Sequence, residues 1–437
     1  MSVLQVHLPP IQSPSGLPTK TIKSMAMSNF NFKRRKMVLV IALASGSVRA
    51  DLIDDSHLSL GIRNVWIDRD YRHENAPKSR IGSWSQGFDL QFRSGYTDGP
   101  LQFGLDIGGQ LAYRLDGTQA RSPDGILPLQ SDGSPVLDYG RASATAKILY
   151  SKTELRIGEQ RPFLPVASYD PSRQLATTYQ GLLLESKEVK DLTLTAGRFW
   201  SIAGRESSNT ENIYLWGDKT SQSSDGLSFV GASYNVTPNF SGTYFYAQLE
   251  DIYRQHYLGI SYRRPLGGGY SLKSDVRYYN NKEEGQALSG RVDNRTYGSM
   301  LSVSKSGHTL GAGYQRMLGQ DIFPTFNSYA PAPYLINWSS LAFVKPGERS
   351  WQVRYDYDFA AMGVPGLTWM ARWMEGNDIH LGNQSHETER TSILSYVVQD
   401  GFFKGVGASW MNIGVNTRNS NKYEENRLII TYNYNFW

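Results

Sequence analysis

The sequence predicts an all-β protein, a transmembrane antiparallel β-barrel, and three observations lead to this prediction. Apolar and polar residues alternate with a period of two along most of the chain after residue 50, as they do in half-buried strands. Some of these segments are longer than the strands of soluble proteins. Short turns and long polar loops alternate between them. Strands with one apolar and one polar face suit a wall with lipid outside and water inside.

The longest alternating segment runs from residue 101 to residue 115, with Leu101, Phe103 and Leu105 at the start of its apolar face. At 3.3 Å per residue such a strand would be about 50 Å long, whereas strands of globular proteins usually have about 3–10 residues. The alternation recurs at 351–359, 367–373 and 428–436. A soluble β-sandwich with one wet face is the alternative, and the length of the strands disfavours it.

Two kinds of connection separate the strands. Tight turns are predicted at residues 98–100, 237–239, 306–308 and 363–366, and long polar connections at 69–82, 117–138, 204–225, 282–295, 320–334 and 376–390. Short turns at one end and long loops at the other are typical of outer-membrane barrels. The spacing fits 16 or 18 strands equally well, so this pattern does not give the strand number.

The first 50 residues have the pattern of a secretory signal peptide. A basic segment, 33–36, precedes an apolar segment, 37–44, and small residues at Val48 and Ala50 mark a cleavage site. We therefore predict a signal peptide at 1–50, cleavage after Ala50, and a barrel domain at 51–437. Residues 1–24 do not fit a signal, which indicates a true start near Met25 or Met27.

The net charge of +5 is misleading, because residues 1–50 carry seven Lys and Arg and no acidic residue. The remaining chain has 38 basic and 40 acidic residues, so no nucleic-acid partner is expected. The absence of Cys excludes disulfides, a Cys-ligated zinc site and a Cys nucleophile.

Enzymatic motifs are also missing from the sequence. The segment 386–390 is not H-E-x-x-H, because its last residue is Arg390, and no G-x-S-x-G occurs. We expect no catalytic residue, no metal and no cofactor. An outer-membrane barrel enzyme stays an alternative, although a disfavoured one.

Several segments, in order along nearly the whole barrel domain, carry a family pattern: residues 63–72, 86–88, 94–97, 151–158, 249–255, 350–356, 363–368 and 396–399. Together they resemble the OprD-type (Occ) substrate-specific porins of Gram-negative outer membranes. The resemblance implies 18 strands, a loop folded inward to constrict the pore, and arginines that guide small carboxylate-bearing solutes. It also implies a monomer or weak homo-oligomer, contact with outer-membrane lipid and lipopolysaccharide, and assembly by the barrel-assembly machinery.

Strand parity places six arginines in the lumen, where a charge costs less than in lipid. They are Arg63, Arg69, Arg156, Arg354, Arg372 and Arg427. As a set they would bias ion selectivity. The alternative is that they are solvated lumen charges paired with carboxylates such as Glu154 and Asp356.

The constriction loop is expected between Gly158 and Gly181, with three prolines to stiffen it. Tyr169, Asp170 and Arg173 are the candidates for its pore-facing residues, the alternative being that they anchor the loop to the wall. One departure from the family pattern weakens the expected carboxylate selectivity: Ser409 and Met411 stand where the family usually carries lumen arginines. A weakly selective general porin is therefore the alternative function.

The C-terminal segment alternates up to Phe436, whereas Trp437 has the opposite parity. We expect Phe436 in an aromatic girdle and the last strand paired with the first around 58–62, because an unpaired strand edge in lipid leaves polar groups unsatisfied.

Overall fold

The computed structural model of the protein describes residues 49–73, 76–217, 222–327, 330–418 and 421–437. Apart from its last two positions, the predicted signal peptide, with Met25 and Met27, lies outside the described residues, and cleavage after Ala50 stays a prediction. Helix α1 (Arg49–Asp54) precedes the first strand. No helix in the described part of the chain is long and apolar enough to cross a membrane.

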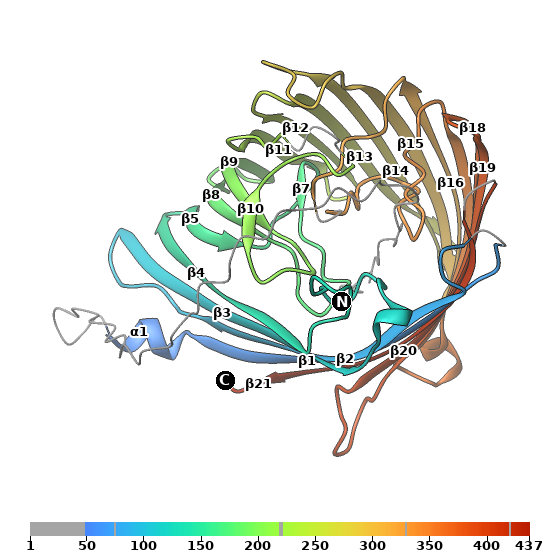
Figure 1. Cartoon of the computed structure of the whole chain (residues 1–437). Helices are drawn as coiled ribbons and strands as arrows, with labels where there is room; N and C mark the ends of the chain where they lie inside the picture. Colours follow the sequence, from blue (N-terminus) through green and yellow to red (C-terminus); the bar gives the residue numbers. More distant parts are fainter. Residues whose placement is uncertain (1–48, 74–75, 218–221, 328–329, 419–420) are drawn as a thin grey trace.

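Within the described residues, 18 strands pair antiparallel with their neighbours and close into a barrel, so the predicted fold class is confirmed (Figure 1). The wall consists of β1 (His57–Tyr71), β2 (Arg80–Arg93), β3 (Leu101–Asp116), β4 (Asp138–Tyr150), β5 (Thr153–Gln160), β8 (Thr178–Ser186), β9 (Leu192–Ala203), β11 (Leu227–Thr237), β12 (Phe240–Leu249), β13 (Tyr253–Gly267), β14 (Tyr270–Glu283), β15 (Asp293–Lys305), β16 (His308–Gly319), β17 (Arg349–Asp358), β18 (Leu367–Leu381), β19 (Gln384–Val397), β20 (Gly407–Thr417) and β21 (Lys422–Asn435).

Two short strands, β6 (Phe163–Leu164) and β7 (Ala167–Ser168), form a separate hairpin, and the short strand β10 (Thr210–Asn212) pairs with the last residues of β9. The short helical segments η1 (Gln119–Arg121) and η3 (Phe359–Met362) lie in connections. Because outer-membrane barrels have short periplasmic turns and longer extracellular loops, the end of the wall with the long loops is the extracellular end.

Large apolar side chains cover the outside of the wall. On β3, Leu101, Phe103 and Ile107 are exposed, whereas Gln110 and Ala112 point inward and are buried. Side chains alternate between the two faces of a strand, so this pattern follows directly from the sequence alternation. Continuous exposed apolar surface of this kind is what a lipid-facing wall requires.

The barrel closes as expected between the first and last strands. Leu60 stands opposite Tyr434 and Ile62 opposite Tyr432, and the Phe436 amide donates to the Leu58 carbonyl at 2.9 Å. Trp437 lies beyond this pairing, with its indole N–H donating to the Ser56 hydroxyl at 2.9 Å. The closing pairs thus end at Phe436.

Deleting Trp437 should therefore leave the yield of folded barrel unchanged, because the residue lies outside the closing strand pairs. Phe436→Asp should lower that yield several-fold, since it puts a charge among the girdle aromatics. The ring centroids of Phe436 and Tyr434 lie 4.8 Å apart. Heat-modifiable mobility of outer-membrane fractions on gels measures the yield. A deletion that blocked assembly, with a tolerated Phe436→Asp, would contradict this register.

Two of the expected long loops differ from the structure. The connection 376–390 is a paired hairpin, since β18 runs on to Leu381 and β19 begins at Gln384. Its inward polar residues, such as Glu387 and Glu389, are buried against the loop 320–348, so the polar sequence does not mean that strand structure is missing. The connection expected at 320–334 continues to residue 348, and β17 begins at Arg349.

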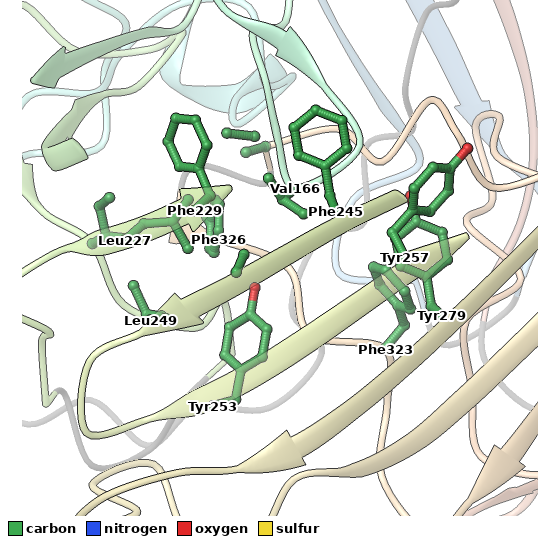
Figure 2. Close-up of a cluster of buried hydrophobic side chains, with 14 of the residues drawn as sticks. Val166, Leu227, Phe229, Phe245, Leu249, Tyr253, Tyr257, Tyr279, Phe323 and Phe326 are labelled. Carbon is green, nitrogen blue, oxygen red and sulfur yellow. The ribbon is translucent and has the colours of Figure 1, made fainter. Parts of the chain in front are cut away.

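The lumen is not polar throughout, which strand parity alone did not predict. Inward side chains of β8–β16 form a buried apolar cluster with residues of two loops (Figure 2). In Figure 2, Val166 lies among Phe229 and Phe245, and Phe323 lies beside Tyr279, with 5.1 Å between the ring centroids. The loops that fold inward displace water there, so apolar side chains are favoured.

Candidate functional site

The connection between β5 and β8, residues 161–177, folds into the barrel and carries the β6–β7 hairpin (Figure 1). Its contacts reach the wall at distant strands. Arg63 on β1 donates to the carbonyls of Pro171 and Arg173, and Gln174 donates to the Ser85 hydroxyl on β2 at 2.8 Å. On the other side, the Tyr279 hydroxyl donates to the Pro165 carbonyl at 3.2 Å. The loop therefore crosses the lumen.

Asp170 and Arg173, predicted for this loop, are both fully buried in it. Asp170 forms an ion pair with Arg205 at 2.6 Å and accepts the Ser172 amide at 2.7 Å. Burial alone would raise the pKa of Asp170, but Arg205 and Arg173 hold that pKa below its ordinary value. These contacts match the anchoring alternative. Tyr169, by contrast, is half-buried and packs edge-on against Phe163, with the ring centroids 6.3 Å apart.

Arg173 lies close to two other arginines, Arg205 and Arg427. Its Nε donates to the Gly125 carbonyl at 2.5 Å, which ties the loop to the connection 117–137. Burial lowers the pKa of Arg173 well below its ordinary value, and the neighbouring guanidiniums of Arg205 and Arg427 lower it further. The guanidiniums of Arg173, Arg205 and Arg427 thus gather near the loop 161–177, with Asp170 and Glu206 as neighbouring carboxylates.

Arg69 and Arg427 face inward, as parity predicts, but neither is open to the pore. Each has a side chain only 1% exposed, and both bind the fully buried Glu425. The Arg69 Nε–Glu425 Oε2 distance is 2.7 Å, and the Arg427 Nε–Glu425 Oε1 distance is 2.5 Å. Arg69 on β1 and Glu425 on β21 stand directly opposite each other in the strand pairing. This cluster therefore links the first and last strands, which close the barrel.

The other three wall arginines keep some exposure. Arg156 is paired with Glu154 at 2.5 Å, and Arg354 makes two hydrogen bonds to Asp356 at 2.6 and 2.7 Å. Arg372 stands directly opposite Arg354 and donates to Ser339 of the loop 320–348. Arg372 also lies 3.6 Å from the Glu389 carboxylate, so the alternative of paired lumen charges describes all three arginines.

Several lumen cations were missed by the sequence interpretation, among them Arg205, Arg161, Lys147 and Arg141. Arg161 binds Asp89 on β2 at 2.6 and 2.9 Å, and Lys147 lies 2.7 Å from Asp106. Arg141 donates to loop carbonyls at Gly204 and Ser207. Arg141 and Lys147 lie on β4, whose outward positions include Ala142, Ala144 and Ala146. Small side chains make the alternation weak, although the parity of β4 could have found both cations.

Ser409 and Met411 point inward on β20, where the resemblance implied arginines. The Ser409 and Ser395 hydroxyls are hydrogen-bonded at 2.8 Å. Met411 is buried with Val65, Ile67 and Ile413 in an apolar cluster. This part of the wall is therefore packed and uncharged.

A buried carboxyl anchors the loop 320–348. Glu348 accepts the Lys345 amide at 3.0 Å, and the Lys345 ammonium donates to Glu387 on β19. Burial raises the pKa of Glu348 well above its ordinary value, and the nearby Glu387 raises it further. A raised folded-state pKa gives stability that is complete below the unfolded-state pKa and is lost as pH rises through the folded-state pKa.

Loop anchoring should therefore weaken as pH rises, because ionised Glu348 would be buried beside Glu387. We expect current noise in single-channel recordings to increase between about pH 5 and about pH 9. Glu348→Gln, which stays neutral, should remove most of this increase, whereas Glu375→Gln, at an outward position of β18, should not. A Glu348→Gln channel with wild-type pH dependence would contradict the assignment.

A closed barrel with a lipid-facing exterior and an inward loop narrowing a charged lumen defines a porin, a channel of the outer membrane rather than an enzyme. The model of the outer membrane porin, OprD family, matches residues 50–436. The chain belongs to this family and is a Gram-negative outer-membrane protein.

Relatives agree with this assignment. The chain is 35% identical over 396 residues to the porin-like protein GalP of Pseudomonas putida, which covers 90% of this chain and 93% of GalP. The crystal structure of Pseudomonas aeruginosa OccK9 matches with a TM-score of 0.86 and 37% identity, over 88% of this chain and all of that one. That of Pseudomonas aeruginosa OpdK with vanillate matches with a TM-score of 0.83 and 30% identity, at the same coverage.

Proposed function

We propose that this channel favours small solutes that carry a carboxylate, and that lumen arginines guide them through the constriction. The observation that carries the proposal is the excess of cations around the loop 161–177. Arg63, Arg69, Arg173, Arg205 and Arg427 gather there with Asp170, Glu206 and Glu425 as carboxylates. Fixed positive charge in a low-dielectric narrow pore raises the local concentration of anions.

The exposure of the wall arginines supports the proposal. The side chains of Arg156 and Arg354 are 44% and 20% exposed and can contact a solute, whereas Arg173 and Arg427 are buried and act only through their charge. Guanidinium donors bind carboxylates well, since the two groups match in geometry. The same chemistry fits vanillate, a carboxylate, with which a related porin was crystallised.

Of the predicted residues, Arg63, Arg156, Arg354 and Arg372 are proposed to guide solutes. Arg69, Arg427, Asp170 and Arg173 are proposed to shape the constriction and its field from buried positions, with Tyr169 beside them. The proposed partners are small carboxylate solutes, lipopolysaccharide and, during biogenesis, the barrel-assembly machinery. We propose that the channel works as a monomer or weak homo-oligomer.

Liposome swelling with benzoate and with its neutral isostere benzamide tests the solute preference. The wild-type channel should admit benzoate faster, and Arg63→Gln should lower the benzoate-to-benzamide rate ratio by roughly threefold, because one cation leaves the constriction. Arg264→Gln is the matched control, since Arg264 is exposed on the outer face of β13. Equal wild-type rates for the two solutes would favour a weakly selective general porin instead.

A further inference from the structure

We propose that the outer face of β12–β15, at the extracellular end, binds the phosphate of a phosphorylated glycolipid of the outer leaflet. The site is a groove lined by Tyr246, Arg254, His256, Asn280 and Lys282. This inference deepens the lipid partner given under the proposed function. It rests on the orientation of the barrel in the membrane and does not depend on which solute the channel admits.

The strand register brings the polar side chains of the groove together. Arg254 stands directly opposite Lys282, and His256 directly opposite Asn280, on neighbouring strands β13 and β14. Asn280 in turn stands opposite Arg295 on β15. The residues between them, such as Gln255 and Asn281, point inward and are buried. The cations therefore lie on the lipid side of the wall.

These cations lack the acidic partners that others at the same end of the barrel have. Arg316 is paired with Asp378 at 3.0 Å, and Arg390 with Glu424 at 2.8 Å. Arg254, Lys282 and Arg295 are exposed, and none forms an ion pair within the described part of the chain.

The nearest carboxylate in register, that of Asp293, stands opposite Lys282, but the two side chains form no ion pair among the described residues. Three cations lie near this one acid, so the groove carries a net positive charge. A bound anion would neutralise that charge.

The height of the groove matches the headgroups of the outer leaflet. One register step below it, towards the middle of the wall, Tyr244, Leu258, Tyr278 and Tyr297 form a row of exposed side chains. Aromatic girdles mark the edge of the hydrocarbon region. Two residues along a strand span about 7 Å, so the cations lie just above that edge, where lipid phosphates are found.

A polar atom in the groove indicates a sugar rather than a bare phosphate. The side-chain oxygen of Asn280 is enclosed and receives no hydrogen bond from any described residue. An ionised phosphate oxygen cannot donate to it, whereas a sugar hydroxyl can. His256 already bonds the Tyr244 hydroxyl at 2.9 Å and packs against Tyr246, which fixes one wall of the groove. A phosphorylated sugar headgroup satisfies both the cations and Asn280.

Binding of bisphosphorylated lipid A to the refolded full chain in detergent, measured by native mass spectrometry, tests the proposal. Arg254→Gln with Lys282→Gln should weaken binding about tenfold or more, since two phosphate contacts are lost. Arg264→Gln should bind as the wild type does, because Arg264 lies on the same face of β13 at the other end. Lipid A stripped of phosphate should bind at least about tenfold more weakly to the wild type.

Heat-modifiable gel mobility confirms that each variant is folded, and the conductance of the double variant should match the wild type. That second result separates this proposal from the one on solutes. Unchanged lipid A binding by the folded double variant would overturn the site. The proposal would also be overturned if phosphate-free lipid A bound to the wild type as tightly as bisphosphorylated lipid A does. The same holds if inorganic phosphate displaced lipid A with an affinity equal to that of the lipid.

Discussion

Glu425→Ala is expected to reduce the yield of folded barrel to near zero. Glu425 is fully buried between Arg69 and Arg427, and the ion pairs connect β1 to β21 across the closing seam. Removing one partner of a buried ion pair costs about 3–5 kcal/mol, because an uncompensated charge stays buried. Here two guanidiniums would be left without their carboxylate. Heat-modifiable mobility and outer-membrane yield measure the loss.

Glu424→Ala is the matched control for this prediction. Glu424 is the neighbouring residue on the same strand and binds Arg390, whose side chain is half exposed, at 2.8 Å. Exposed pairs contribute about 0–1 kcal/mol, so its removal should be tolerated. Replacing Arg69, Glu425 and Arg427 together by Met should restore much of the yield, since a whole buried ion cluster can be exchanged for apolar residues. A folded Glu425→Ala barrel at the Glu424→Ala yield would contradict this account.

Replacing residues 163–176 with a short Gly-Ser link is expected to raise single-channel conductance at least twofold. The loop crosses the lumen through contacts with Arg63 and Ser85 on one side and Tyr279 on the other. Its removal therefore widens the narrowest part of the pore. Planar-bilayer recording of the refolded variant provides the measurement.

A milder variant keeps this second prediction testable if the shortened loop folds poorly. Asp170→Ala removes the carboxylate that holds Arg205, so the loop should loosen and conductance should rise by less. Asp132→Ala, in the connection 117–137, removes an exposed carboxylate that bonds Ser134 and should change nothing. A loop-shortened, folded channel with wild-type conductance would place the constriction elsewhere.

The barrel itself was predictable because its chemistry is repeated in every strand. An apolar residue at each second position gave the lipid face, and the absence of a free strand edge in lipid required β21 to pair with β1. The same alternation failed at 376–390, where both faces of the hairpin are polar. In this barrel, apolar and polar residues alternate in a strand only where one of its faces contacts lipid. The alternation is therefore lost where a strand extends beyond the membrane.

The site was predictable only in part, because parity gives the face of a residue and not its partners. It placed Arg69 and Arg427 inward, but only the structure shows that Glu425 buries both. It also assigned the lumen to water, whereas inward loops cover Phe229, Phe245 and Tyr279 with apolar side chains. Contacts between a loop and a distant wall depend on the tertiary fold, which the sequence pattern does not encode.

The reversal potential of the refolded protein in a planar bilayer, under a gradient of potassium benzoate, tests the central claim most directly. A channel narrowed by the loop 161–177, with an excess of arginines around that loop, should show discrete conductance steps and a reversal potential shifted towards that of benzoate. Arg63→Gln should move this potential towards that of potassium. A wild-type reversal potential at the potassium value, or no conductance steps at all, would contradict the account.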